Sequence, residues 1–195
     1  SDWASRFVHA ANRMEARGIP VLLGTPYDVT GEVIPPFPLS TIPHSIAVVH
    51  KDGNVFAEDK ITRRALTYLN DKPVFHVELA QRLGLIGSGE RPSGSFHVPE
   101  VEGYYFFFRY HGSTLLNPTT PDQLPYQRIP FIEVLRGNYT EDTFRGKNVL
   151  VGTLSREDSG DFAFTPYSKN AFMSPKLVVH ANILDSVIQN DGILR

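Results

Sequence analysis

The chain has 195 residues, of which 41% are hydrophobic and 21% are charged, and its formal net charge is −2. This composition is that of an ordinary globular protein, and it offers no basic excess to neutralise phosphates, so nucleic acid is not an expected partner. The absence of cysteine excludes disulfides, thiolate catalysis and cysteine metal sites, and no apolar run approaches the roughly 18 residues of a membrane-spanning helix.

The first part of the chain predicts one helix followed by short strands. Residues 3–17 place apolar side chains at helical spacing and end before a glycine and a proline, which indicates an amphipathic helix. A short strand is expected over 21–23. Residues 24–43 are rich in proline and predict a long connection with little regular structure. Two short apolar runs around Asp52-Gly53, within 46–56, suggest a hairpin or tight turn.

The remainder alternates strand-like and helix-like segments. The expected strands are 63–69, the aromatic run 104–110, whose continuity indicates burial on both faces, and the buried strand 148–152. The expected helices cover residues 74–84, 131–135 and 178–188, and the expected loops cover 87–94 and 118–130. This alternation predicts an α/β layered domain with a mixed, partly parallel central sheet flanked by helices.

Several segments in order carry a family resemblance. They are FRGKNVLVGT at 144–153, Asp161, TPYS at 165–168 and VHANILDS at 179–186, preceded by DKITRR at 59–64 and FRYHG at 108–112. The order resembles the C-terminal signature of CHASE2 domains, in which a GKxVLVG strand precedes a D…TP loop and a helix containing HAN. The resemblance covers about residues 19–195 and is strongest over 128–195.

The resemblance implies an extracytoplasmic sensor, periplasmic or extracellular, of a bacterial transmembrane receptor. Such domains are flanked by transmembrane helices, which this chain lacks, and are coupled to an intracellular cyclase or kinase. A homodimer, an unknown small-molecule or environmental signal and no cofactor are expected. Residues 1–195 are expected to form a single domain that lacks the family's N-terminal segment, with its D…WPW-R pattern.

Three candidate ligand-binding residues carry charge. Arg63 and Arg109 can clamp a carboxylate or phosphate, although a surface position is the default for an arginine. Arg63 and Arg64 are expected on opposite faces of their strand. Asp161 either holds a cation with Glu157 and Asp158 or caps a loop, and the spacing favours the cap because it lacks the pattern of a calcium loop.

The other candidates are Thr165, His180 and Asn182. His180 is interpreted either as a ligand contact or pH-sensitive switch, or as a buried histidine bonded to a loop carbonyl, and its apolar surroundings favour burial. Asn182 either binds a ligand or caps the helix that it opens, and capping is favoured.

No catalytic residue, metal site or enzyme motif is predicted, so the chain is not expected to be an enzyme. Two alternatives remain open. One is a periplasmic hydrolase with a scattered catalytic set that includes His180 and Asp161, which needs a nucleophile within reach of a histidine. The other is an interaction scaffold without a small ligand, which predicts a filled core and no concave polar pocket.

Overall fold

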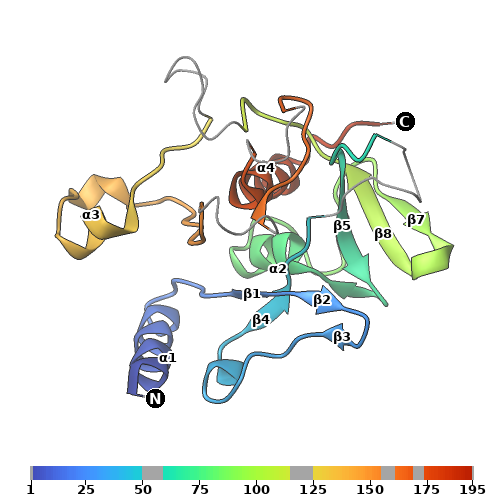
Figure 1. The fold of residues 1–195 in the computed structure, drawn as a ribbon. Coiled ribbons are helices and arrows are strands. Elements are labelled where there is room, and N and C mark those ends of the chain that lie inside the picture. Colours follow the sequence, from blue (N-terminus) through green and yellow to red (C-terminus); the bar gives the residue numbers. More distant parts are fainter. Residues whose placement is uncertain (1, 50–58, 115–124, 155–160, 169–173, 195) are drawn as a thin grey trace.

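The largest sheet has four antiparallel strands in the order β6-β5-β8-β7 (Figure 1). These strands are β5 (Arg64–Leu69), β6 (Lys72–Pro73), β7 (Phe96–Val98) and β8 (Gly103–Phe107). The computed structural model describes residues 2–49, 59–114, 125–154, 161–168 and 174–194. The chain is a mixed α/β protein, as predicted, with parallel pairing in a separate small sheet.

A bulge in β5 decides which side chains reach the core. The register shifts between Leu66 and Tyr68, so Thr67 is the extra residue, and its hydroxyl donates to the Tyr104 carbonyl at 2.9 Å. Because a bulge inverts the alternation of side chains, Tyr68 joins Ala65 in the same core cluster. Neither the bulge nor the short strands β6 and β7 were predicted.

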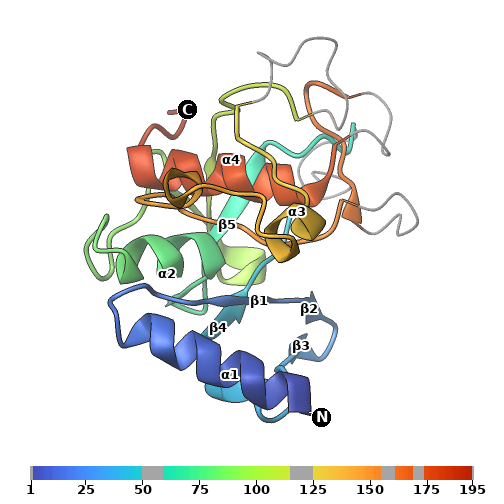
Figure 2. The ribbon, with the colours of Figure 1, turned by 90° about the vertical axis from the view of Figure 1, so that its left-hand side faces the viewer.

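Helices α2 (Phe75–Arg82) and α4 (Lys176–Gln189) lie next to one another on one face of this sheet (Figure 2). The core between them has members from both helices and from the sheet: Ala65, Tyr68, Val77, Ala80, Phe106, Phe108, Ala163, Val179, Ile183 and Val187. A smaller cluster on the opposite face contains Leu66, Val74, Val98 and Tyr105. The predicted double-sided burial of the aromatic strand is therefore confirmed at Tyr105 and Phe106, although the strand ends at Phe107 and does not extend to Tyr110.

The N-terminal part adds a helix and two small sheets. Helix α1 (Asp2–Glu15) contacts the 3-10 turn η1 (Leu39–Thr41). Strands β1 (Leu23–Thr25) and β4 (His44–Ile46) pair in parallel, and β2 (Tyr27–Asp28) pairs with β3 (Gly31–Glu32). A Cβ on Gly24 would lie 2.7 Å from the Ala47 Cβ, so the parallel pair needs glycine there.

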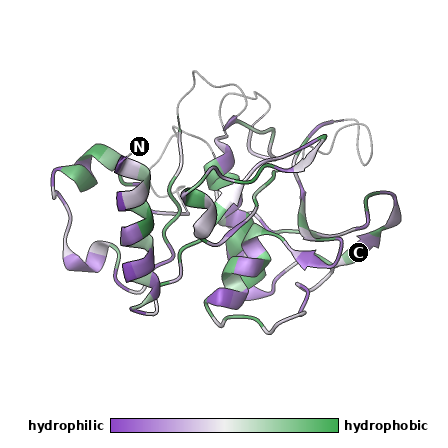
Figure 3. Cartoon of the chain, turned by 90° about the horizontal axis from the view of Figure 1, so that it is seen from below, coloured by the Kyte–Doolittle hydropathy of each residue, from purple (hydrophilic) through white to green (hydrophobic). Residues whose placement is uncertain are grey.

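Helix α1 is buried through different residues from those that its pattern suggests. Ala4 and Ala11 are its buried residues, whereas Trp3, Phe7 and Met14 remain exposed. Hydrophobic and hydrophilic turns alternate along this helix when the molecule is seen from below (Figure 3). Helix α1 is therefore buried through its small residues, and its larger apolar side chains remain accessible to solvent.

An arm at the edge of the molecule contains helix α3 (Phe131–Leu135) and the 3-10 turn η4 (Glu141–Thr143) (Figure 1). The predicted helix 131–135 is confirmed, but the predicted buried strand 148–152 is wrong. Val149 and Val151 are 53% and 79% exposed, and the segment forms no strand. The apolar run has strand propensity, but no described strand pairs with it.

The predicted helices 74–84 and 178–188 are confirmed as α2 and α4, and the strand 63–69 as β5. Of the suggested hairpin at 46–56, residues 50–58 lie outside the described residues. In the part of the chain that the structure describes, no helix has the length and apolar character needed to cross a membrane.

Candidate functional site

The chain leaving β8 is held by side chains of helix α4. Asn182 Oδ1 accepts a hydrogen bond from the His111 backbone N–H at 2.8 Å, and Ser186 Oγ accepts one from the Arg109 N–H at 2.8 Å. Ser186 also donates to the Arg109 carbonyl at 3.2 Å. Residues four apart share a helix face, so Asn182 and Ser186 point to the same side of α4. They form hydrogen bonds with the backbone of residues 109–111 that a neighbouring strand would otherwise form. We call residues 109–111 with Asn182 and Ser186 the α4 seam.

The predicted capping role of Asn182 is therefore wrong. Asn182 lies in the middle of α4 and is fully buried. Its amide nitrogen donates to the Val178 carbonyl at 2.8 Å. Both ends of the side-chain amide are thereby bonded inside the protein, as a buried polar group requires.

A polar cluster continues the seam towards the end of α4. The Tyr126 hydroxyl donates to Asp185 Oδ2 at 3.2 Å, and His111 Nε2 lies 3.8 Å from the same oxygen. Asp191 Oδ2 lies 3.6 Å from His111 Nε2 and 3.4 Å from Arg109 Nε. We call these five residues the α4 polar cluster. Three separate segments of the chain, residues 109–111, the loop at 126 and residues 185–191, converge there.

The electrostatics of the α4 polar cluster favour a protonated phenol. Burial, followed by the negative charge of Asp185, raises the pKa of Tyr126 because both disfavour a phenolate. Tyr126 is thus a hydrogen-bond donor at physiological pH. Asp191 Oδ1 is buried and has no hydrogen-bond partner among the described residues. The cluster therefore retains an acceptor that its own side chains do not use.

This arrangement does not match a hydrolytic triad. Ser186 Oγ lies 3.4 Å from His111 Nε2, and both neighbouring carboxylates also approach Nε2. A triad needs the hydroxyl and the carboxylate on different ring nitrogens, so that one orients the ring while the other exchanges a proton. Ser186 is also fully buried and already bonded to the backbone of Arg109.

His180 forms a pair with a histidine that the sequence did not indicate. His76 Nε2 lies 2.9 Å from His180 Nδ1, and the two rings stack with centroids 5.1 Å apart. The expected bond from His180 to a loop carbonyl is wrong. Burial lowers the pKa of His180 to about 4, with a smaller contribution from Lys176. Burial, then the neighbouring His180, lowers the pKa of His76 well below its ordinary range.

Thr165 belongs to a buried triangle of hydroxyl groups. Its Oγ1 lies 2.8 Å from Thr114 Oγ1 and 3.1 Å from Ser174 Oγ, and the third side measures 2.9 Å. All three residues are fully buried. Each hydroxyl can donate to one neighbour and accept from the other, so the triangle satisfies itself and joins three loop segments.

Arg63 lies at the surface. Its guanidinium binds both oxygens of Asp59, at 2.9 and 2.7 Å. This hydrogen-bonded pair lowers the pKa of Asp59 to about 2. Arg64 is buried instead, with its guanidinium 5.3 Å from the centre of the Phe107 ring.

Asp161 is partly buried. The two acidic residues suggested to hold a cation with it, Glu157 and Asp158, lie outside the described residues. Across the described segments, no group of three or more histidines and carboxylates is arranged to hold a metal ion.

The structure thus brings only Arg109 and Asn182 together among the predicted residues, and it places the others apart. The residues that sequence reasoning did not single out are His76, His111, Tyr126, Asp185, Ser186 and Asp191. Ser186 had a detectable signal, because it lies one helical turn from Asn182 on a predicted helix. His76 and Tyr126 had none, because their partners are distant in the sequence.

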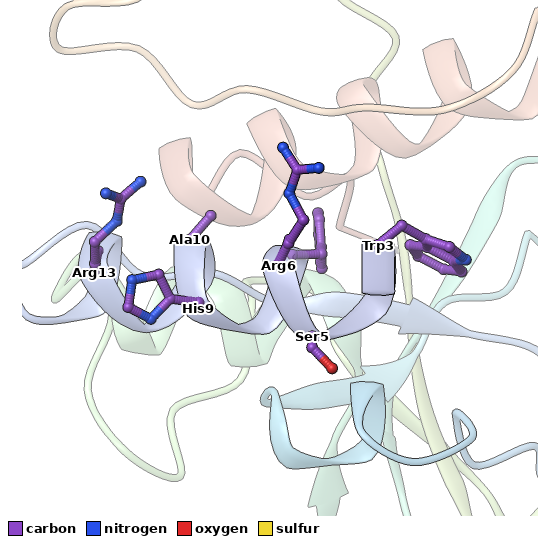
Figure 4. Close-up of a pocket in the computed structure, with 7 residues that line it drawn as sticks. Trp3, Ser5, Arg6, His9, Ala10 and Arg13 are labelled. Carbon is purple, nitrogen blue, oxygen red and sulfur yellow. The ribbon is translucent and has the colours of Figure 1, made fainter. Parts of the chain in front are cut away.

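A separate open depression of about 680 Å³ lies along α1 (Figure 4). Its described lining residues all come from that helix: Trp3, Ser5, Arg6, Phe7, His9, Ala10 and Arg13. None of the six predicted ligand-binding residues is among them. Figure 4 shows the two arginines pointing away from Ser5, so their polar groups do not converge on one point.

The fold is therefore a mixed α/β domain whose C-terminal helix is bound through polar side chains to loops at the end of an antiparallel sheet. The family model of the CHASE2 domain matches residues 10–195. The chain belongs to the CHASE2 family, whose members are extracytoplasmic sensor domains generally found in receptors with cyclase or kinase domains. No curated protein and no solved structure matches the chain significantly.

Proposed function

We propose that residues 1–195 form one sensor domain of a bacterial transmembrane receptor, which passes a ligand- or state-dependent change to an intracellular cyclase or kinase. Family membership over residues 10–195 carries this proposal. The domain itself is not catalytic, and the enzymatic output belongs to another part of the receptor. It lies on the periplasmic or extracellular side of the membrane and acts as a homodimer.

The contacts of α4 support a role for this helix in transmission. Its side chains hold residues 109–111, and the chain that follows it is tied to the sheet, because the Ile193 N–H donates to the Phe107 carbonyl at 2.8 Å. A displacement of the loops at the α4 polar cluster therefore reaches both α4 and the tail that follows it. A ligand shifts a conformational equilibrium only if it binds one conformation more tightly than the other, and loops that are linked to α4 allow such a difference.

The α4 polar cluster is the proposed place of ligand action. Arg109 is 56% exposed and offers a cation, while the buried Asp191 Oδ1 is an acceptor that has no partner among the described residues. A small polar molecule that carries both a hydrogen-bond donor and an anionic group would complement these two residues.

A ligand screen by thermal shift tests this proposal. Small zwitterionic and anionic metabolites are expected to raise the unfolding temperature of the wild-type domain. The shift should disappear in Arg109→Gln, whereas Arg145→Gln, which alters an exposed arginine paired with Glu141, should behave as the wild type. A hit whose shift survives in Arg109→Gln would refute the placement of the ligand.

The receptor role has its own test. In spheroplasts that carry the full receptor, with the outer envelope removed and the cytoplasmic membrane intact, an added protease should reach this domain. In intact cells, the ligand should change the production of the cyclic nucleotide or phosphorylated product. A domain that is protected from the added protease until the cytoplasmic membrane is broken would refute the extracytoplasmic placement.

A further inference from the structure

The hydrogen-bonded histidines His76 and His180 connect the two helices that cover the large sheet. His76 lies on α2 and is 1% exposed, and His180 lies on α4 and is partly buried. Their nitrogens are 2.9 Å apart, so one proton lies between them. His76 Nδ1 is buried and has no hydrogen-bond partner among the residues that the structure describes.

Counting protons fixes the neutral form of this pair. Each neutral imidazole carries one N–H. If His180 donated through Nδ1, then His76 would carry its own proton on Nδ1, where a buried N–H would have no acceptor. A buried N–H without a partner costs roughly 1–3 kcal/mol. The favoured form therefore has His76 Nε2–H donating to His180 Nδ1, with His76 Nδ1 unprotonated and the second proton on His180 Nε2.

The same count shows why the pair resists a further proton. Three protons must then occupy four nitrogens, and the hydrogen bond retains only one of them. The other two must sit on His180 Nε2 and His76 Nδ1, whichever ring carries the charge. Adding a proton while keeping the bond thus always creates an N–H at the buried position that has no acceptor. The alternative is to break the bond between the helices.

The groups around the two rings make protonation of the pair still less favourable, and none of the described groups compensates by accepting the extra hydrogen bond. No described hydrogen bond of either ring ends on a carboxylate, and Phe75 contacts both rings edge-on. Lys176, on α4, is the charged residue that acts on His180. The other titratable or charged groups on α2, on α4 and on the strands that contact α2 are His44, Arg64, Tyr68, Lys72, Glu78, Arg82 and Asp185. The Tyr68 hydroxyl donates to the Glu90 carbonyl at 2.8 Å.

These other groups either have hydrogen-bond or ion-pair partners elsewhere or lie at the surface. Glu78 and Arg82 pair with each other at 3.2 Å, and Asp185 accepts from Tyr126. The His44 ring contacts the Ile42 carbonyl, Arg64 lies over Phe107, and Lys72 is exposed. None of them offers an acceptor to His76 Nδ1.

We propose that His76 and His180 form a proton-sensitive contact that holds α2 against α4 while it is neutral and lets the helices separate when it takes up a proton. Once the helices part, water supplies the acceptor that His76 Nδ1 lacks, and the rings regain ordinary basicity. Acidification of the compartment would thereby open the face of the sheet that α2 and α4 cover. This proposal depends only on the geometry of α2 and α4, and it holds whichever ligand or output the receptor has.

The first test is a long-range ¹H–¹⁵N NMR titration of the ring nitrogens in the wild-type domain. At neutral pH, His76 Nδ1 should give the signal of an unprotonated nitrogen and His76 Nε2 that of a protonated one. The pair should stay neutral to well below pH 6.5, and its protonation should coincide with shifts of α2 and α4 amides. Ordinary titration of either ring near pH 6.5 without those shifts would overturn the proposal.

The second test uses variants that keep the hydrogen bond and cannot titrate. His76→Gln places an amide donor near the position of Nε2, and His180→Asn places a carbonyl acceptor near that of Nδ1. In the wild type, protection factors of α2 and α4 amides should fall up to about tenfold per pH unit between about 6.5 and about 4, because the open form binds one more proton. They should stay nearly constant in the double variant.

His9→Asn, at an exposed position on α1, should follow the wild type. Equal pH dependence in the double variant and the wild type would assign the effect to other groups and overturn the proposal. If the double variant fails to fold, the ring-nitrogen titration of the wild type decides alone. Neither result depends on finding a ligand, so failure here leaves the sensor proposal standing, and the reverse also holds.

Discussion

Helices α4 and α3 both carry apolar residues, but only α4 buries them. In α4, Val179, Ile183 and Val187 recur every four residues and enter the core, and polar Asn182 and Ser186 are buried beside them. In α3, Phe131 and Leu135 remain 64% and 66% exposed. The difference shows that burial follows from the partner that a helix finds, and that polar side chains can secure that partner.

The regions that contain α4 and α3 differ in the same way as the two helices. The interior region, formed by α2, α4 and the four-stranded sheet, is held by long-range contacts such as the α4 seam. The arm, residues 131–154, is held mainly by local pairs, for example Arg136 with Glu133 and Arg145 with Glu141. Local exposed pairs contribute little to stability, so substitutions in the two regions should differ sharply.

The largest difference is expected from a phenylalanine in each region. Phe106→Ala removes a fully buried ring and should lower the free energy of unfolding by about 4 kcal/mol. Phe131→Ala removes an exposed ring of α3 and should change it by less than about 0.5 kcal/mol. Urea denaturation measures both. Similar losses in the two variants would show that α3 is covered in solution.

A pH change should also act on the interior region. The pKa of His180 is about 4 in the folded protein and about 6.5 when unfolded, so the unfolded state takes up the proton first. Stability from this group is therefore complete above pH 6.5 and falls by about 3 kcal/mol as the pH drops to about 4. Urea midpoints across this range measure the loss. In His180→Asn, the decline should be reduced, and an unchanged decline would contradict this assignment.

Two asparagines provide the next comparison. Asn182→Ala leaves the His111 N–H without its buried acceptor and should cost about 2–3 kcal/mol. Asn138→Ala removes an exposed bond to Glu133 in the arm and should cost less than about 0.5 kcal/mol. Urea denaturation of both variants measures these changes in the free energy of unfolding. A neutral Asn182→Ala would mean that the α4 seam does not hold residues 109–111.

The hydroxyl triangle should give a smaller effect. Thr165→Val keeps the shape of the side chain but deprives Thr114 and Ser174 of one partner, so a loss of about 1–2 kcal/mol is expected. Thr140→Val, at an exposed position of the arm, serves as the matched control. If both variants unfold at the same urea concentration as the wild type, the triangle has no role in stability.

The exposed ion pair between Arg63 and Asp59 should have the smallest effect. Solvent screens this pair, so Arg63→Gln is expected to leave the urea midpoint unchanged within error. In the same variant, the pKa of Asp59, which is about 2 with its partner, should rise towards the ordinary aspartate value. A carbon-detected NMR titration of the Asp59 carboxyl measures it, and an unchanged pKa would contradict the pairing.

Local patterns in the sequence sufficed for α2, α4 and the aromatic strand, because each repeats its apolar residues at the spacing of one structural element. They failed for residues 148–152, since an apolar run indicates strand propensity but not whether a neighbouring strand is available. They also failed for Asn182, whose position near the start of an apolar pattern resembled a cap. The His76–His180 pair joins residues 104 positions apart, and no local signal marks such a contact.

The most direct measurement is amide hydrogen exchange at neutral pH across the two regions. The Arg109 and His111 amides, which bind Ser186 and Asn182, are expected to exchange as slowly as those of β5 and β8. Amides of 148–152 should exchange quickly. Fast exchange at Arg109 and His111, or core-like protection at 148–152, would contradict the claim that α4 secures the interior region through its polar side chains while the arm remains uncovered.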